Sequence, residues 1–510
     1  KSYDMVATAI QINRSWKSDT QWFGDYIGTY VQSTLGRATD AQAHAAARAV
    51  AESGRYLPGT PEFIAAYNAS INDPNLLTGS KFQDASKYYH ADGNYNFSHL
   101  IDWAEIQVGG SYRKYKLNSS GTIYTDTDGT IDYSEYGMYT QIQKGIELND
   151  ALSLKLTGSV RYDKSEFFDG FFSPRLSAGL TLNRDHNIRA SVQTGFRNPT
   201  TQDLFIGLDA GRAILVGSAP DNLNRYTRDF NVSLEGQTMF GQPSTITQTG
   251  AAAYNNSYSA SSVTAFAAAG NPALLTVANP EIIKPEKVTS LEVGYRGKYE
   301  SVIVDVSAYY NKYEDFIGNK TVVVPHYGKV DFSDIVPLPA QLGGPTPAAL
   351  IAIGNGDWQP FQVYTNSTAD IASYGGSIGL STKVAGNYSL GLSYTYAKFD
   401  FDQASDPDYE AGFNTPENKV KFSIGNTDLI ENLGFNVNVR WSDEYFWQSS
   451  FVDAVIDART VVDAQINYTV PKWKSTFKIG GANLGGQEYL SAPGNGIIGS
   501  QYFASWTINP

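Results

Sequence analysis

Residues 433–441 read LGFNVNVRW, and apolar and polar side chains alternate along this stretch. Successive side chains of a β-strand point to opposite faces, so the stretch predicts a strand with one apolar face and one polar face. The pattern recurs at residues 152–162 and 302–311. About fifteen such stretches, roughly ten to sixteen residues long, exceed the usual strand of a soluble protein. We therefore expect an all-β fold, a transmembrane antiparallel β-barrel.

Composition agrees with this fold. No run reaches the roughly 18 apolar residues that a membrane helix needs, whereas a barrel crosses the bilayer with backbone hydrogen bonds closed between strands. The chain has 34 Tyr, 25 Phe and 8 Trp, as expected of aromatic belts at both membrane surfaces. The absence of Cys excludes disulfides, and a net charge of −13 argues against nucleic acid as a partner.

Short and long connections alternate between the predicted strands. Because outer-membrane barrels have short periplasmic turns and long extracellular loops, this alternation gives the orientation. Counting back from the C-terminus gives about fifteen strands, the first at about residues 84–97, with a possible sixteenth before it. We expect residues 3–12 to end an ascending strand and residues 13–83 to form an extracellular loop. The predicted domains are therefore 1–83, a strand end plus that loop, and 84–510, the C-terminal part of the barrel.

The first loop carries helix signals. Residues 39–42 read TDAQ, a capping box before an Ala-rich run that ends at Gly54. Thr60 and Pro61 predict the start of a second helix, closed by Asp73 and Pro74. Two interpretations remain open: a lid over the barrel mouth, or a compact loop without ligand contact.

The two longest loops, at about 197–286 and 314–357, are expected to carry function, because long ordered loops of a barrel usually do. Aromatic residues that we expect to be exposed there and nearby could stack on sugar or peptide ligands. The alternative is that they anchor the loops or belong to the outer aromatic belt. The residues are Tyr254, Tyr258, Phe266, Trp358, Phe361 and Trp447.

Other site chemistry is sparse. Residues 126–132 read DTDGTID, so Asp126, Asp128 and Asp132 are a weak candidate for a calcium site. The segment lacks the distal Glu of an EF-hand, and a plain acidic turn is favoured. The five His have no metal-ligand spacing and are expected on the surface. No nucleotide-binding motif or nucleophile–base set is present, so we expect neither an enzyme nor a cofactor.

Three segments resemble TonB-dependent outer-membrane transporters. Residues 195–205, GFRNPTTQDLF, resemble the family segment GFRxPTxxxLF. Residues 279–295, with NPEIIKPE leading to LEVGY, are similar to NPxLKPExxxxxELGY, and residues 483–508 are similar to the closing segment of the family. The segments occur in the family's order, and the resemblance spans roughly residues 84–510. The helical loop and the region from Gln202 to Arg212 look most like the Bacteroidetes branch with a carboxypeptidase-regulatory-like domain.

The resemblance implies a 22-stranded barrel filled by an N-terminal plug, energised by the TonB complex through a TonB box. It also implies a scarce nutrient as ligand: an iron chelate, oligosaccharide, peptide or cobalamin-like compound. The chain departs from this pattern, because it shows no plug, no TonB box, no signal peptide and too few strands. We expect it to be the C-terminal part of a longer multi-pass protein of the cell outer membrane. A partner surface lipoprotein is neither indicated nor excluded.

The segment after residue 195 supplies the best candidates for contact with ligand or plug, namely Arg197, Asn198, Gln202 and Asp203. The alternative is that Arg197 and Asp203 only hold the end of the strand together. Polar side chains on the inner strand faces are expected to hydrogen-bond to the plug. These are Lys155, Arg161, Asp305 and Arg440.

Three function classes follow from these expectations. An active nutrient transporter requires a plug and a TonB box. A 16-stranded, porin-like passive channel requires residues 3–12 to be a strand and a loop to narrow the pore. A barrel enzyme requires a catalytic constellation at the rim, which the sequence does not offer. The transporter is the favoured interpretation, and a receptor or structural barrel is a further alternative.

Overall fold

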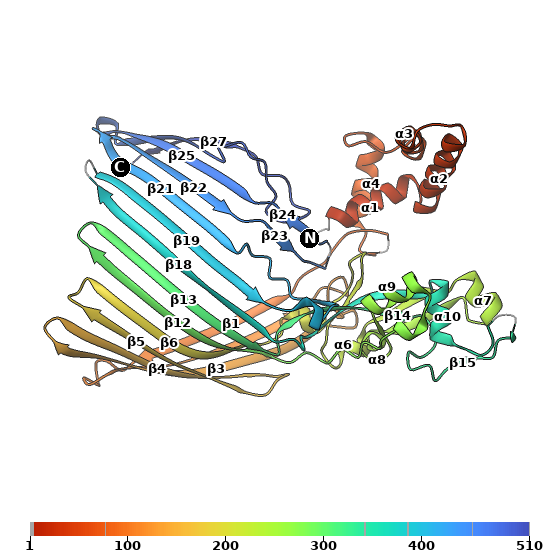
Figure 1. Cartoon of the computed structure of the whole chain (residues 1–510), viewed down its shortest axis with the longest axis horizontal. Helices are drawn as coiled ribbons and strands as arrows, with labels where there is room; N and C mark the ends of the chain where they lie inside the picture. The colour runs from red at the N-terminus through yellow and green to blue at the C-terminus, as the bar shows by residue number, and fades with distance from the viewer. Residues whose placement is uncertain (1–4, 77, 341–342, 385–386, 451, 509–510) are drawn as a thin grey trace. The chain divides into compact units, whose positions relative to one another are not determined.

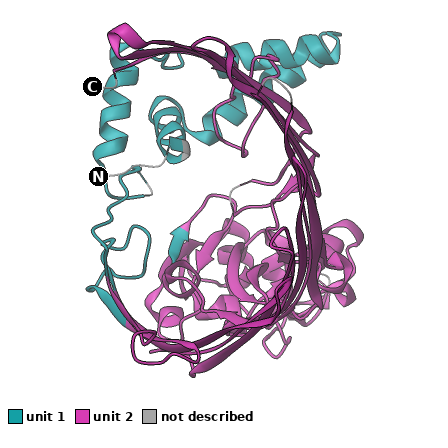
Figure 2. Ribbon diagram, turned by 90° about the vertical axis from the view of Figure 1, so that its left-hand side faces the viewer, with its two compact units in different colours: residues 1–89, 115–133, 206–208 teal, residues 90–114, 134–205, 209–510 magenta. Residues whose placement is uncertain are grey.

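The computed structural model describes residues 5–76, 78–340, 343–384, 387–450 and 452–508. The chain forms two compact units, coloured separately in Figure 2. Unit 1 comprises residues 1–89, 115–133 and 206–208, and unit 2 comprises residues 90–114, 134–205 and 209–510. Among the described residues, no helix has both the length and the apolar character needed to cross a membrane.

The dominant element is a fifteen-stranded sheet whose strands lie side by side in Figure 1. The order follows the chain, and from β3 to β27 neighbouring strands are antiparallel. The predicted strand count is confirmed. The strands are β1 (Lys87–Asn96), β2 (Glu105–Leu117), β3 (Ile131–Asn149), β4 (Leu152–Ser165), β5 (Phe171–Leu182), β6 (His186–Arg197), β12 (Glu286–Tyr299), β13 (Val302–Glu314), β18 (Ile371–Val384), β19 (Tyr388–Asp400), β21 (Asn418–Ile430), β22 (Leu433–Ser442), β25 (Arg459–Val470), β26 (Ser475–Ala482) and β27 (Gln501–Ile508).

The register of the sheet sorts side chains into an apolar face and a polar face. Val437 lies opposite Ile424 on one neighbouring strand and Ala464 on the other, whereas Asn438 lies opposite Ser423 and Asp463. Large apolar side chains on the first face are solvent-exposed, for example Ile479 at 70%. Such a face is stable where lipid covers it, so the exposed apolar face is the membrane-facing one.

Short turns join the strands at the predicted positions. Residues 183–185 connect β5 to β6, and residues 431–432 connect β21 to β22. Asn183 and Asn432 have φ values of 51° and 66°, in the left-handed region that Asn tolerates better than most residues. The tight turns fix the register of each hairpin, which in turn fixes which side chains face lipid.

The N-terminal segment is helical from its first described residue. The expectation that residues 3–12 end a strand is wrong for residues 5–12, because Thr8, Gln11 and Ile12 are buried at helical spacing. The two helices predicted at 39–54 and 60–73 are confirmed, with Thr39 and Thr60 as their N-caps. The helices are α1 (Met5–Trp16), α2 (Asp19–Leu35), α3 (Asp40–Ala51) and α4 (Pro61–Asn72).

In unit 2, long connections fold together into what we call the loop domain, residues 209–285, 315–370 and 401–417. Its sheet has the order β11-β14-β17-β8-β7, with β20 on β14. Helix α5 (Thr201–Phe205) precedes the loop domain, whose described helices are α6 (Asn222–Arg225), α7 (Leu234–Phe240), α8 (Ala251–Asn255), α9 (Ala260–Ala269) and α10 (Ala348–Asn355). The 3₁₀ turns among the described residues are η1 (Pro272–Leu274), η4 (Gln403–Ser405) and η5 (Pro471–Trp473). The shorter strands are β7 (Gly207–Asp209), β8 (Ile214–Val216), β9 (Thr227–Asn231), β10 (Thr245–Thr249), β11 (Tyr258–Ser259), β14 (Ile317–Pro325), β15 (Ile335–Val336), β16 (Thr346–Pro347), β17 (Trp358–Asn366), β20 (Tyr409–Glu410), β23 (Tyr445–Trp447) and β24 (Ala454–Ile456).

The loop domain has a hydrophobic core of its own. Residues from separate connections meet there, because β8 pairs in parallel with β17 through Ile214 and Phe361. Ile214, Val324, Phe361 and Val363 are fully buried. The two longest loops therefore form one packed body rather than two independent loops.

The two faces of β22 allow a direct test of the membrane orientation. We expect Val437→Lys to destabilise the barrel by about 2–4 kcal/mol, because a lysine at the lipid face near the bilayer midplane loses its hydration. Asn438→Lys, one residue away on the polar face, should be nearly neutral. Urea unfolding in phospholipid vesicles, followed by tryptophan fluorescence, measures both. Equal losses for the two variants would contradict the assignment of faces.

Candidate functional site at the base of the loop domain

An ion pair joins the large sheet to the loop domain. Arg197 ends β6, Glu286 begins β12, and the two are register partners with an Nη2–Oε2 distance of 2.7 Å. The same Glu286 oxygen accepts the backbone N–H of Ile317 at 3.0 Å, and Arg197 also donates to the Ile317 carbonyl at 3.3 Å. One carboxylate thus holds the ends of β6, β12 and β14. Two of the three motif segments meet at this point.

The residues after Arg197 are also bonded within unit 2. Asp203 is buried and accepts the Thr200 backbone N–H at 2.7 Å. Burial raises the pKa of Asp203, although hydrogen bonds from Thr200 and the nearby Arg197 oppose the shift. Gln202 donates to the Tyr364 hydroxyl at 2.7 Å, and Asn198 donates to Glu135 at 2.9 Å. These contacts support a structural role, and contact of these four residues with ligand or plug stays a prediction.

The aromatic candidates differ in exposure. The expectation that Tyr254 and Tyr258 are exposed is wrong, because their side chains are 3% and 1% exposed and belong to the loop-domain core. Tyr254 donates to the Tyr364 carbonyl at 3.0 Å, and burial raises the pKa of Tyr258 to about 12. The expectation of exposure is also wrong for Phe361, which is fully buried, whereas Trp358 and Trp447 are half-buried. A ligand role for these two tryptophans remains a prediction.

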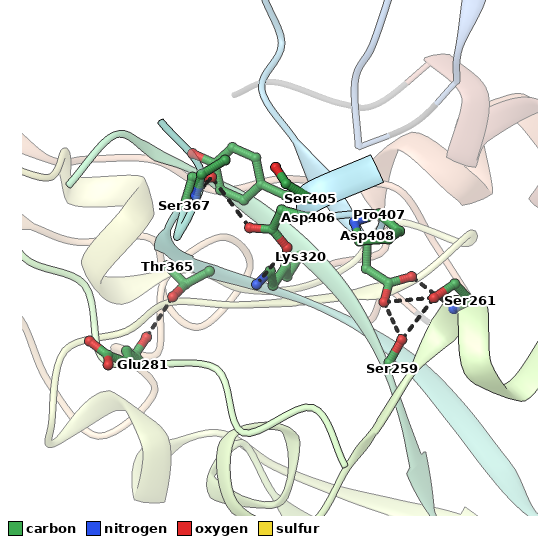
Figure 3. Close-up of polar contacts among 12 residues, drawn as sticks. Ser259, Ser261, Glu281, Lys320, Thr365, Ser367, Ser405, Asp406, Pro407 and Asp408 are labelled. Atoms are coloured by element: carbon green, nitrogen blue, oxygen red, sulfur yellow. Dashed lines mark hydrogen bonds and ion pairs between the residues drawn. The ribbon is translucent and has the colours of Figure 1, made fainter. Parts of the chain in front are cut away.

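A third connection fastens the loop domain. Residues 402–410 of the loop domain, which we call the strap, follow β19, and Figure 3 draws their contacts with Lys320, Ser367, Ser259 and Ser261. Asp406 pairs with Lys320 at 2.7 Å, and their side chains are only 6% and 19% exposed. Asp408 accepts the backbone N–H of Ser261 at 2.7 Å and hydrogen bonds from the hydroxyls of Ser259 and Ser261, at the start of α9. Sequence reasoning missed the strap, because its acidic residues bond to partners in distant loops and only an acidic segment is visible in the sequence.

The strap ends in a second polar cluster. Tyr409 is fully buried and donates to the Phe316 carbonyl at 2.7 Å. Glu410 accepts a hydrogen bond from Gln362 at 2.8 Å, and Arg212 lies 3.9 Å from Glu410 and 2.7 Å from Asp453. Burial raises the pKa of Glu410, and the charge of Arg212 opposes that shift. The cluster ties four separate connections together.

One histidine of the loop domain is buried, contrary to the expectation of a surface position. His326 is 9% exposed, and its ring stacks on Phe230 with a centroid distance of 4.9 Å. Neither ring nitrogen has a hydrogen-bond partner among the described residues. Burial lowers the pKa of His326 from its ordinary 6.5, and Asp357 partly opposes the shift. The ring is therefore favoured in its neutral form.

The acidic turn at residues 126–132 is organised by its own chain. The Asp126 carboxylate is buried and accepts hydrogen bonds from the Ser119 backbone N–H, from the Ser119 hydroxyl at 2.6 Å and from the Gly121 backbone N–H at 2.8 Å. Across the ranges that the structure describes, no group of three or more His, Cys, Asp and Glu is placed to hold a metal ion. Asp126 thus closes a turn, whereas calcium binding with Asp128 and Asp132 stays an untested, weaker alternative.

Charged side chains on the polar face of the large sheet pair with one another. Arg440 lies 2.8 Å from Asp463, Arg161 lies 2.6 Å from Asp163, and Arg189 lies 3.4 Å from Asp305. Pairing lowers the cost of holding these charges on one wall. Whether they and Lys155 also contact a plug remains a prediction.

Comparison with known proteins agrees with the strands and the motif segments. The family described as TonB dependent receptor-like, beta-barrel matches residues 3–484. The chain belongs to this family. A TonB-dependent receptor barrel is an outer-membrane protein that crosses with many strands, as the exposed apolar face of this sheet requires. The expected family, the antiparallel β fold and the outer-membrane location are thereby confirmed. The Bacteroidetes branch and the closed 22-stranded barrel stay predictions.

This chain aligns with only part of the length of each relative. A 99-residue region is 29% identical to the vitamin B12 transporter BtuB of Vibrio vulnificus strain CMCP6, covering 19% of this chain and 16% of that protein. The siderophore receptor PirA of Acinetobacter baumannii matches with a TM-score of 0.51 at 12% identity, over 82% of this chain and 54% of the other. A variant of the ferric enterobactin receptor PfeA of Pseudomonas aeruginosa also has a TM-score of 0.51, at 14% identity, over 85% and 55%. The barrel chain spans about half the length of these solved receptors.

The Arg197–Glu286 pair should stabilise the base of the loop domain. We expect Arg197→Ala to lower the stability of that domain by about 1–3 kcal/mol, because it leaves a nearly buried carboxylate with an unpaired charge. Lys284→Ala is the matched control, since Lys284 pairs with Glu281 in the same segment but both side chains are more than half exposed. Hydrogen exchange of residues 317–325 reports on the change. Equal protection in both variants would contradict this role.

His326 should make the loop domain sensitive to acid. Because its folded-state pKa is depressed, it contributes stability that is present above about pH 6.5 and lost as pH falls through the folded-state pKa. Thermal unfolding at pH 7 and pH 5 should show a smaller acid loss in His326→Phe than in the wild type. His99→Gln, at an exposed turn, should leave the loss unchanged. The prediction fails if His326→Phe keeps the full acid loss.

Proposed function

We propose that this barrel is the C-terminal part of an outer-membrane TonB-dependent transporter that imports a scarce nutrient. The observation that carries the proposal is the family match over residues 3–484, on a sheet of fifteen strands with an exposed apolar face. A folded loop domain stands where the strands β6, β12 and β13 end, as Figure 1 shows. That position suits capture of a ligand before it enters the barrel.

The physical problem of import supports an energised mechanism. A barrel wide enough for a large nutrient leaks unless a plug fills it. The outer membrane has neither ATP nor a steep ion gradient, so uphill import needs energy delivered across the periplasm. In the proposal, a plug domain closes the barrel and the TonB complex supplies this energy through a TonB box.

The edges of the large sheet support a larger barrel. Strand β1 pairs only with β2, and β27 only with β26, in the sheet that the described residues form. All residues of both strands are exposed. An unpaired strand edge within lipid leaves backbone groups without partners, which costs several kcal/mol for each group. We propose that further strands, up to the family's 22, cover these edges.

The nutrient is proposed at the level of a class. The relatives named above are a vitamin B12 transporter, a siderophore receptor and a ferric enterobactin receptor. Cobalamin and ferric chelates are therefore the first compounds to test, followed by oligosaccharides and peptides. A surface lipoprotein partner remains a prediction.

The first test is the intact mass of the protein from its native outer membrane, with N-terminal peptide mapping. We expect a mass well above the 55.7 kDa of this chain, with a plug-like domain and a TonB box ahead of the barrel. Uptake of the bound nutrient should then stop when the proton gradient is collapsed or TonB is removed.

The contrary outcome is equally well defined. A mass near 55.7 kDa together with large, steady currents in planar bilayers would overturn the proposal. The protein would then be a porin-like passive channel, since a plugged transporter does not conduct steadily.

A further inference from the structure

The helical segment of unit 1, residues 5–72, contains a cavity. Its volume is about 430 Å³, within the range of small-molecule sites. Helix α1, helix α4 and the connection between α3 and α4 all contribute residues to its lining. The lining residues are Met5, Thr8, Ala9, Ile12, Asn13, Arg55, Tyr56, Leu57, Pro58, Phe63 and Tyr67.

The lining of the cavity includes two buried residues of α1 and a pair of nearly parallel aromatic rings. Thr8 and Ile12 are 3% and 5% exposed, and the Thr8 hydroxyl already bonds to the Ser80 hydroxyl at 2.6 Å. Phe63 and Tyr67 lie one turn apart on α4, with ring centroids 6.4 Å apart and an angle of 11° between the rings. The small side chain of Ala9 leaves the space between the helices open. A flat or narrow apolar group fits in this space.

Among the described residues that line the cavity, Arg55 is the only charged one. It forms no ion pair with any residue in the described part of the chain, whereas two other arginines of the segment are paired. Arg14 lies 3.1 Å from Asp19, and Arg48 lies 3.5 Å from Glu52. An unpaired guanidinium offers two parallel donors to a carboxylate or sulfonate. The cavity therefore combines apolar walls with one uncompensated positive charge.

We propose that this cavity binds an amphipathic organic anion. Its apolar body lies against Phe63 and Tyr67, and its anionic head bonds to Arg55. The site belongs wholly to the helical segment, so the proposal stands or falls independently of import through the barrel.

The experiment uses the whole chain in lipid nanodiscs and two matched probes. 2-Naphthoate carries the anionic head, and 2-naphthalenemethanol has the same ring system without the charge. We expect the wild type to bind the anion at least about fivefold more tightly than the alcohol, because of the charge-assisted hydrogen bonds. Ligand-observed NMR, with empty nanodiscs as the blank, gives both affinities.

Three variants separate the contributions. Arg55→Gln should reduce the affinity for naphthoate to that for the alcohol and leave the alcohol unchanged. Ala9→Trp should abolish binding of both probes by filling the cavity. Arg48→Gln, the matched control on α3, should change neither affinity. Circular dichroism confirms that each variant keeps its helices.

Two results would overturn the inference. Failure of 2-naphthoate to bind the wild type above the nanodisc blank, up to about 1 mM, would show that the cavity holds no such ligand. Loss of binding in Ala9→Trp with no effect of Arg55→Gln would show a purely apolar pocket, and would refute the choice of an anion.

Discussion

Backbone hydrogen bonding in lipid is the constraint on which the rest of this molecule depends. A peptide group within the hydrocarbon has no water to bond to, so each strand must pair with its neighbour along its whole membrane-crossing length. Regular pairing imposes the two-residue alternation, and alternation separates a lipid face from a polar face, as at Val437 and Asn438. The same rule forbids irregular backbone within the membrane. The chain therefore places its irregular structure beyond the strand ends, where the loop domain folds.

At the base of the loop domain, ion pairs hold the chain segments together where the regular backbone pairing of the strands ends. Glu286 accepts from Arg197 and from Ile317, and so fixes where β14 leaves the large sheet. Asp406 and Lys320 make a second buried pair on the strap. A buried ion pair contributes little net stability compared with apolar packing, but it is costly to separate. Such pairs suit a junction whose connections must meet in one arrangement.

The features that can be predicted from the sequence are those that depend on residues close together in the chain. Strand faces and tight turns depend on neighbouring residues, and both the strand count and the caps at Thr39 and Thr60 are found as expected. The expectation of a strand is wrong for residues 5–12 because apolar residues there fit either period, and burial of Thr8, Gln11 and Ile12 follows the helical one. Tyr254, Tyr258 and His326 were placed outside because a polar loop composition conceals a core built from distant segments. The contacts of Arg197 and Asp203 depend on the same distant pairings.

The strap has a consequence for how the protein matures. Strands β8, β14 and β17 are separated by long stretches of chain, and the strap follows all of them in sequence. The loop domain therefore has a high contact order, because its contacts join residues far apart in the sequence. The strap, the last of these segments, becomes available only after β19 has been synthesised. During biogenesis, the apolar residues of β8 and β14 are not fully buried until the later segments pack against them. Closure of the loop domain would thus be among the late steps of biogenesis, and a chain interrupted before residue 402 would lack the strap and leave the core of this domain partly uncovered and open to proteolysis.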